Sequence, residues 1–210
     1  KYMAMPVIQG SKSESERFAG AEETLCIEAL MQDGKALQAG TSHFLGQNFA
    51  KAFDVKFADK SGKLEYVWAT SWGVSTRLMG ALIMSHSDDS GLILPPLLAP
   101  IQIIIIPLIN SEESSEKILN KTNDLFNSIK KTGTRVKIDD RENLSLGFKL
   151  NDSEVKGIPM RIVIGENEVE KDEFDIFFRY NLGKVSAKFS ELTSIVETSI
   201  IKIQEDMILK

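Results

Sequence analysis

The stretch that decides the fold reads Gly34-Lys-Ala-Leu-Gln-Ala-Gly-Thr-Ser-His43 and continues Phe-Leu-Gly-Gln-Asn-Phe-Ala-Lys-Ala-Phe53. Its first ten residues contain two glycines together with a Gln, a Thr, a Ser and a His, with apolar residues around them. Small residues allow the backbone to approach a ligand closely, and polar side chains between them can face that ligand. The stretch therefore predicts one wall of a nucleotide pocket.

The composition is that of a globular protein with a core of its own. Of the 210 residues, 42% are hydrophobic and 26% are charged, which fits one large domain or two of ordinary size. A chain of this length can fold without disulfides or a structural metal. Cys26 is the single cysteine, and with His43 and His86 it cannot assemble a zinc site of the usual kind. One cysteine also indicates a reducing compartment, and we expect the cytoplasm.

Charge and hydropathy argue against a broad basic surface for nucleic acid and against a membrane span. The formal net charge is −5 at pH 7, so any contact with RNA has to be local and shape-specific rather than driven by a bulk positive field. The uncharged stretch from Leu92 to Ile109 reaches the length of a membrane span, but prolines interrupt it and we expect no membrane segment. Residues 1–6 lack the layout of a signal peptide, and their direct entry into strand-like sequence indicates a fragment.

The first half of the chain mixes strand and helix patterns. Leu25, Ala29 and Leu30 fall at helical spacing, and Asp33-Gly34 would end such a helix. Alternating residues on both sides of the turn at residues 59–62 predict an antiparallel hairpin. The expected elements are a strand over 2–9, a helix over 22–32, strands over 53–58 and 64–71, and a helix over 78–84.

The second half has the pattern of an α/β domain. Ile101–Ile106 fits a strand buried on both faces, and Asn110 or Ser111 can cap the helix that follows. Strand, helix and strand in this order predict a right-handed parallel crossover, and Asn181-Leu-Gly183 predicts a later hairpin turn. The other expected features are an inner helix face of Ile118, Thr122, Leu125 and Ile129, strands over 134–138, 157–164, 174–180 and 184–189, a helix over 143–151, and a closing helix from Ser190 with Leu192, Ile195, Val196, Ile203 and Met207 inward.

Two stretches place polar residues where ligands commonly bind. Asp139-Asp-Arg-Glu142 follows a predicted strand, at the sheet edge that usually faces ligands in α/β domains. Arg77 stands near the start of the helix over 78–84, where a cation is unfavourable unless a ligand phosphate lies beside it. The alternative for Arg77 is a surface side chain that extends into solvent.

Several strings resemble one family. Glu16-Arg-Phe-Ala-Gly20, the stretch from Gly34 to Phe49, and Thr70-Ser-Trp-Gly-Val-Ser-Thr-Arg-Leu-Met-Gly80 resemble the catalytic domain of the prolyl-tRNA synthetase family, in its archaeal and eukaryotic-like form. Gly91-Leu-Ile-Leu-Pro-Pro96 resembles the exit from that domain. The rest resembles the family's anticodon-binding domain, including Asp140-Arg141, Gly147-Phe-Lys149 and Glu154-Val-Lys-Gly-Ile-Pro-Met-Arg161. The resemblance covers nearly the whole chain.

The resemblance implies a fold in two parts. Residues 1–98 would be the C-terminal part of a class II catalytic domain, an α+β structure on a partial antiparallel sheet. Residues 99–210 would be an anticodon-binding domain of α/β type, with a mixed sheet and flanking helices. Of the three class II motifs only the third is present, as Gly73-Val-Ser-Thr-Arg77. We therefore expect that this chain alone does not activate proline.

The resemblance also implies a reaction and the residues that serve it. The family activates L-proline with ATP to prolyl-adenylate and transfers the prolyl group to the 3′ end of tRNA(Pro), as a homodimer when full-length. By resemblance Arg77 is the catalytic residue, and Gln38, Thr41, Ser75 and Arg77 bind ATP, with Gln38 also near a magnesium ion. His43, Phe18 and Trp72 would line the proline pocket, and Glu154 and Arg161 would contact the anticodon.

Other interpretations stay open at the level of sequence. The chain could be a non-catalytic tRNA-binding paralogue or a regulatory module derived from a synthetase, or a generic α/β nucleotide-binding protein. Gln38 could be a loop-stabilising amide, and His43 and His86 could be structural. Phe18 and Trp72 could be ordinary core residues, and Glu154 and Arg161 a surface ion pair. Ser75 stands where the family often has Thr, and Asn167 and Glu168 depart from its pattern.

Overall fold

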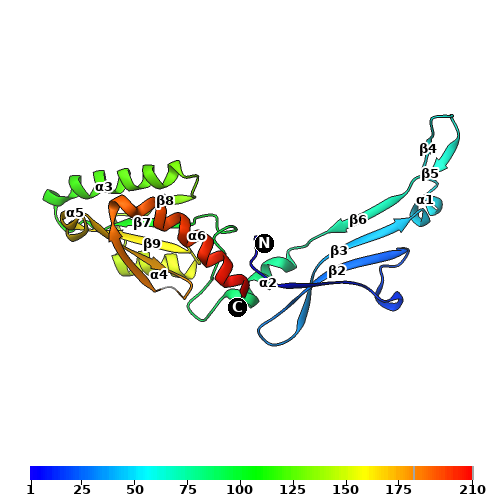
Figure 1. Ribbon diagram of the computed structural model, residues 1–210, viewed down its shortest axis with the longest axis horizontal. Helices are drawn as coiled ribbons and strands as arrows, with labels where there is room; N and C mark the ends of the chain where they lie inside the picture. The colour runs from blue at the N-terminus through cyan, green and yellow to red at the C-terminus, as the bar shows by residue number, and fades with distance from the viewer. Residues whose placement is uncertain (182, 210) are drawn as a thin grey trace. The chain divides into compact units, whose positions relative to one another are not determined.

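The computed structural model describes residues 1–181 and 183–209 and divides the chain into two compact units (Figure 1). The smaller unit is Pro6–Ser85, and the larger unit combines Lys1–Met5 with His86–Lys210. The division therefore falls before His86, earlier than the boundary expected between residues 98 and 99.

The segment between residues 87 and 100 accounts for the earlier boundary. Its backbone is held by the larger unit: the Leu92 N–H donates to the carbonyl of Val155 at 3.0 Å. Arg135 donates to the carbonyls of Ala99 at 2.8 Å and Pro96 at 2.9 Å. These hydrogen bonds satisfy the polar groups of an otherwise irregular segment, so the prolines mark a strap on the larger unit rather than a linker.

The smaller unit is built on an antiparallel sheet. Among the described residues this sheet has four strands in the order β1 (Val7–Ser11), β2 (Glu23–Leu30), β3 (Ala36–Gly46) and β6 (Ala69–Gly73). β3 is the longest strand of this sheet and is hydrogen-bonded to β2 on one side and β6 on the other. The stretch that carries Gln38, Thr41 and His43 is thus an interior strand.

The helix predicted over residues 22–32 is wrong, because β2 occupies that segment. Leu25, Ala29 and Leu30 do lie at helical spacing, but the segment pairs along its length with β1 and β3. Asp33-Gly34 forms the tight turn between β2 and β3, in which the Met31 N–H donates to the carbonyl of Lys35 at 2.8 Å. Glycine at positive φ ends helices and closes hairpins alike, so the local signal was ambiguous and the non-local pairing decided it.

The remaining elements of the smaller unit follow the sequence more closely. The predicted hairpin is confirmed as β4 (Lys56–Ala58) paired antiparallel with β5 (Leu64–Tyr66). The predicted helix is confirmed as α2 (Arg77–His86), which packs near the β2–β3 turn through a hydrogen bond from Gln32 to the Ser85 carbonyl. Two short elements complete this unit, η1 (Glu14–Glu16) and α1 (Asn48–Ala52).

The larger unit contains a mixed sheet, as expected. Within the described residues its strand order is β11 (Lys184–Lys188), β10 (Glu173–Phe178), β9 (Met160–Ile164), β7 (Ile103–Pro107) and β8 (Val136–Ile138). β7 is parallel to β8 and β9, and β10 is antiparallel to β9 and β11. Every residue of β7 is buried, as its unbroken apolar sequence predicts. Leu182, in the predicted turn before β11, lies outside the described residues.

Helices cover both faces of this sheet. On one face α3 (Glu112–Lys131) and α6 (Leu192–Leu209) form the main core with the side chains of Ile103, Ile105, Met160, Ile162 and Phe174. On the other face lies α4 (Leu146–Val155) (Figure 1). Its Leu146 and Leu150 pack against Ile104 and Ile106. The predicted Ser111 cap and the buried α3 face are confirmed. α5 (Glu166–Lys171) and η2 (Phe189–Glu191) complete the unit.

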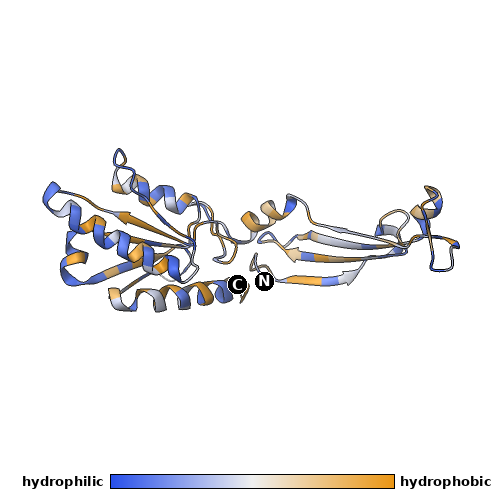
Figure 2. Cartoon of the chain, turned by 90° about the horizontal axis from the view of Figure 1, so that it is seen from above, coloured by the Kyte–Doolittle hydropathy of each residue, from blue (hydrophilic) through white to orange (hydrophobic). Residues whose placement is uncertain are grey.

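Hydropathy follows this layering. The strands of the larger unit carry long hydrophobic stretches beside shorter hydrophilic ones, and its helices carry hydrophilic and hydrophobic bands in turn (Figure 2). Banding of this kind is typical of helices with one face on a core and one in water. Across the described part of the chain, no helix combines the length and the apolar character that crossing a bilayer requires.

Candidate functional site

The register of β3 sorts the predicted site residues onto two sides of the small sheet. Thr41 lies opposite Cys26 and Gly73, and His43 lies opposite Thr24 and Ser71. Side chains directly opposite each other in an antiparallel sheet share a face, and neighbours along a strand alternate. We call the face with Thr41 and His43 the polar face, and the face with Ser42, which lies opposite Leu25 and Trp72, the apolar face.

An irregularity in β3 brings Gln38 to the polar face. Ile27 lies opposite Gly40 whereas Glu28 lies opposite Gln38, so Ala39 is an extra residue in β3. A β-bulge of this kind reverses the alternation from that point along the strand. Without it Gln38 and Thr41, three positions apart, would face opposite sides of the sheet. Because of it, both stand on the polar face.

Gln38 is held by a lysine that the sequence did not single out. The Lys12 ammonium donates to the side-chain oxygen of Gln38 at 2.6 Å. Lys12 follows the end of β1, and its N–H donates to the carbonyl of Thr24 at 2.9 Å. The contact spans 26 positions of sequence, so no local pattern could have indicated it.

His43 is oriented from two sides. Its Nδ1 shares a hydrogen bond of 2.9 Å with the hydroxyl of Thr24, which is fully buried. The centroid of the Phe18 ring lies 4.9 Å from that of the imidazole. The Phe18 ring also stacks on the ring of Phe49, at 6.2 Å between centroids. Phe18 and His43 are therefore brought together, as the resemblance implies for a proline pocket, and Thr24 fixes the imidazole in place.

Ser75 and Arg77 lie at the start of α2. Arg77 is the first residue of the helix, and its backbone N–H donates to the hydroxyl of Ser75 at 3.3 Å. Both side chains are exposed. The guanidinium is thus free to reach a ligand over the polar face, next to the unpaired N–H groups of a helix start.

A cleft of about 350 Å³ joins these groups. Its lining includes six of the predicted site residues, namely Gln38, Thr41, His43, Trp72, Ser75 and Arg77. Ser71 and Gly73 also line it, on the strand opposite His43 and Thr41. Ser71 could not be predicted, because the sequence does not show which residue lies opposite His43 on the neighbouring strand.

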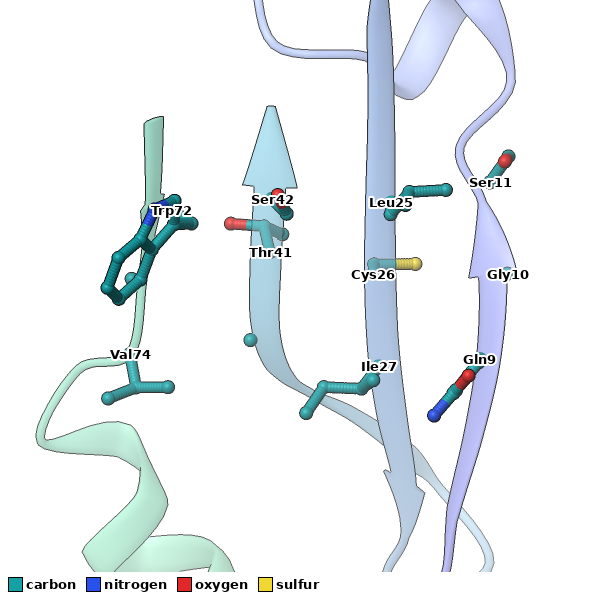
Figure 3. A pocket seen from close by; sticks show the side chains of 12 residues that line it. Gln9, Gly10, Ser11, Leu25, Cys26, Ile27, Thr41, Ser42, Trp72 and Val74 are labelled. Atoms are coloured by element: carbon teal, nitrogen blue, oxygen red, sulfur yellow. The ribbon is translucent and has the colours of Figure 1, made fainter. Parts of the chain in front are cut away.

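Trp72 does not join Phe18 and His43. It borders the cleft from the edge strand β6, but its pairing with Ser42 places the indole on the apolar face. There it lies beside a second hollow of about 570 Å³ whose lining includes Leu25, Ile27 and Val74 (Figure 3). The indole is 79% exposed. The indole and the His43 ring therefore start from opposite faces, because adjacent strand residues point to opposite sides, and the role of Trp72 in the proline pocket stays a prediction.

In the larger unit, Asp139 and Arg141 of the stretch Asp139–Glu142 join an ion network with Asp152. Both side-chain oxygens of the buried Asp139 accept from Arg141, at 2.7 Å each. Arg141 also reaches Asp152 at 2.8 Å, on α4. The hydrogen bonds from Arg141 hold the pKa of Asp139 below its usual range. The network fastens α4 to the end of β8, which is a structural role.

Glu154 and Arg161 are in contact. Arg161 Nη1 donates to Glu154 Oε2 at 3.1 Å and to the carbonyl of Leu150 at 3.3 Å. Glu154 lies on α4 and Arg161 on β9, so the pair bridges helix and sheet. Both side chains are partly exposed. Glu168, in contrast, is occupied locally, since its carboxylate accepts from the N–H of Gly165 at the start of α5.

Comparisons with known proteins agree with this geometry. Residues 102–199 match a family described as an anticodon binding domain. A proline–tRNA ligase of Flavobacterium psychrophilum is 57% identical over the whole of this chain and 42% of its own length. Those of Christiangramia forsetii (56% identical, 98% of this chain, 42% of the relative) and Bacteroides fragilis (53%, 100% and 42%) are similar.

The mixed sheet with its flanking helices and the family match agree in identifying residues 102–199 as an anticodon-binding domain. Over 98–100% of its length, the chain is similar to a part of these proline–tRNA ligases. It spans about 42% of the length of these relatives.

Proposed function

We propose that this chain supplies part of the adenylation site and the anticodon-reading domain of a proline–tRNA ligase. The reaction is the ATP-dependent activation of L-proline to prolyl-adenylate, followed by transfer to the 3′ end of tRNA(Pro). The observation that carries the proposal is the single cleft on the polar face that gathers Gln38, Thr41, His43, Ser75 and Arg77. A paralogue that only binds tRNA would have no use for that cleft.

The chemistry requires positioning and charge stabilisation more than acid–base catalysis. The carboxylate of proline attacks the α-phosphorus of ATP, the bond to the bridging oxygen breaks, and pyrophosphate leaves. Excess negative charge in such a step is stabilised by fixed cations and donors. Arg77 supplies a planar cation that can stack on adenine and donate to a phosphate. The Thr41 and Ser75 hydroxyls add donors along the same cleft.

The proline pocket would be the end of the cleft nearest Phe18 and His43. An aromatic ring beside an imidazole offers an apolar wall for the pyrrolidine ring together with a polar group for its amine. Selection by size in such a pocket is limited to about 1–3 kcal/mol per methylene.

The contacts of Gln38 weigh against a magnesium ion at this position. Magnesium prefers several oxygen ligands in near-octahedral geometry. Gln38 offers one amide oxygen, and the Lys12 ammonium already occupies it at 2.6 Å. We propose instead that Lys12 brings positive charge to the phosphates of ATP.

Anticodon reading falls to Glu154 and Arg161. A guanidinium donates to O6 and N7 of guanine, and a carboxylate accepts from donors on a base edge. In single-stranded loops such edges are accessible to side chains. Because only Nη1 of Arg161 takes part in the described hydrogen bonds, its other nitrogens can meet a base while Glu154 holds it in place.

Titration of the chain with a non-hydrolysable prolyl-adenylate analogue, followed by calorimetry, tests the adenylation site. We expect binding that Arg77→Ala and His43→Ala weaken by about 10-fold or more, since each removes a charged or polar contact worth about 1–3 kcal/mol. Leu25→Ala is the matched control, because Leu25 lies on the apolar face, is half exposed and does not line the cleft.

Two results would contradict the proposal. Binding that is lost in Leu25→Ala but kept in His43→Ala would place the ligand on the apolar face. A chain that binds tRNA(Pro) in a filter assay, with loss on anticodon mutation, but shows no affinity for the analogue would favour the non-catalytic paralogue.

A further inference from the structure

A row of three side chains crosses the larger sheet beside α4. Phe177 on β10 lies opposite Arg161 on β9 and opposite Lys184 on β11. Residues opposite one another share a face, and α4 covers that face over Ile104 and Ile106 of β7. The row therefore continues the surface that begins at Glu154 and Arg161, next to α4.

The Phe177 ring is flanked by both cations. The Arg161 guanidinium carbon lies 5.9 Å from the ring centroid, and the Lys184 ammonium lies 5.8 Å from it. The ring is partly exposed, in contrast to the fully buried Phe174 and Ile176 of the same strand. Arg161 and Lys184 therefore border the flat apolar face of the Phe177 ring. Because this ring is partly exposed, a ligand can reach it.

The charges of this row are balanced within the chain. Arg161 is paired with Glu154 at 3.1 Å, and Lys184 is paired with Asp175 at 2.6 Å. A ligand held mainly by phosphate charge would find little excess positive field here, in keeping with the net charge of −5. A planar ligand with donors and acceptors on its edge suits the row better, because the ring offers its face and the ion pairs offer both signs at the rim. An unpaired nucleobase is such a ligand.

We propose that Phe177 is a stacking platform for one unpaired base of an anticodon loop, next to the base edge that Arg161 and Glu154 read. This inference rests on the proposed function of the larger unit as an anticodon-binding domain. It adds a residue that was absent from the predicted site, and it assigns Lys184 to the rim of the same base site.

The experiment uses the whole chain and an RNA hairpin with the anticodon stem and loop of tRNA(Pro), with binding followed by fluorescence anisotropy at fixed salt. Phe177→Leu keeps an apolar side chain but removes the aromatic plane, and Phe177→Trp keeps the plane. Stacking on an aromatic side chain predicts a loss of roughly 5- to 100-fold for Phe177→Leu. Phe177→Trp should bind within a few-fold of the unmodified chain.

Phe126→Leu is the matched control. Phe126 is also partly buried and lies 5.4 Å from a lysine, Lys130, but it packs with the core on the other face of the sheet. A general loss of stability would therefore affect both leucine variants, whereas loss of stacking affects only Phe177→Leu. Hairpins with one abasic position each add a second readout. At the stacked position, and only there, Phe177→Leu should cause no further loss.

The outcomes separate this inference from the proposed function. Binding by the unmodified chain that ignores the anticodon sequence would overturn the anticodon function and this inference with it. Anticodon-dependent binding that is equal in the unmodified chain and Phe177→Leu would overturn this inference alone. So would a loss in Phe177→Leu that is the same for every abasic hairpin.

Discussion

At the scale of single residues, the ion pair between Asp88 and Arg179 connects several segments of the larger unit. The Arg179 guanidinium is nearly buried and donates to both oxygens of Asp88, at 2.9 and 2.5 Å. The same side chain donates to the carbonyls of Glu154 and Gly91. One arginine thus joins the strap at residues 87–100 to the end of α4, next to the residue we propose for anticodon reading.

This pair has a predicted pH signature. Hydrogen bonds from Arg179 hold the pKa of Asp88 at about 2, below its usual 3.8. A carboxylate with a lowered pKa contributes stability above its unfolded pKa, and that contribution is lost as the pH falls through the folded value. We expect Asp88→Asn to cost about 1 kcal/mol near neutral pH, since Asp88 is half exposed and solvent screens the pair.

Urea unfolding of the larger unit at a series of pH values measures this effect. The difference between the unmodified chain and Asp88→Asn should be constant above about pH 4 and shrink towards pH 2. Asp206→Asn is the control, because its partner Lys202 is an exposed neighbour one helical turn away. A difference for Asp88→Asn that does not change with pH would show that the ion pair is not its source.

At the scale of elements, the contact between the strap and α4 depends on a glycine. Gly91 has φ +136, and a Cβ at this position would lie 2.6 Å from the Cα of Val155, at the end of α4. The backbone of Val155 cannot move aside in the way that the end of a flexible side chain can. The close approach is what allows the Leu92 N–H to reach the Val155 carbonyl.

We therefore expect Gly91→Ala to destabilise the larger unit by about 2 kcal/mol or more, through clash and strain together. Gly147→Ala is the matched control: no heavy atom lies within 4 Å of the added Cβ, and alanine within α4 should be neutral or stabilising by up to about 1 kcal/mol. Urea midpoints measure both. Equal midpoints for the two variants would mean that the strap can move away from α4 at no cost.

At the scale of the whole molecule, the two units differ in how much apolar surface they bury. The hydrophobic residues buried in the described part of the smaller unit are mostly small, namely Ala29, Met31, Ala39, Ala50, Ala81 and Leu82. The larger unit buries isoleucines, leucines and Phe174 around one sheet. Burial of large side chains is the dominant stabilising contribution, so the larger unit should be the more stable one.

We expect unfolding in two steps, with residues 6–85 first. Pulse-labelling hydrogen exchange across a urea series, read by mass spectrometry, should show β1–β3 exchanging at lower urea than β7 and α3. Ile105→Ala removes a fully buried side chain of the larger unit and should cost about 2–5 kcal/mol in the second step alone. A single transition shared by all segments, shifted as a whole by Ile105→Ala, would show that the units unfold together.

Sequence patterns alone determined most of the larger unit. β7 and α3, and with them β8, were predictable from local patterns. The burial of β7, the Ser111 cap and the inner face of α3 each depend on residues that are adjacent or helically spaced in the sequence. The predicted site strings of the smaller unit were also readable, and six of their residues do line one cleft. For Thr41 and His43 their positions in the chain were enough, because residues two apart on one strand share a face.

Tertiary structure alone decided three other features. Strand pairing turned a helix-like segment into β2, the register of β6 moved Trp72 to the apolar face, and the bulge at Ala39 brought Gln38 to the polar face. The same holds for Lys12 at Gln38 and for Arg161 and Lys184 around Phe177. In each case the partner lies on another strand or beyond a loop, and which strand face a side chain occupies is set by pairing with distant residues rather than by its sequence neighbours.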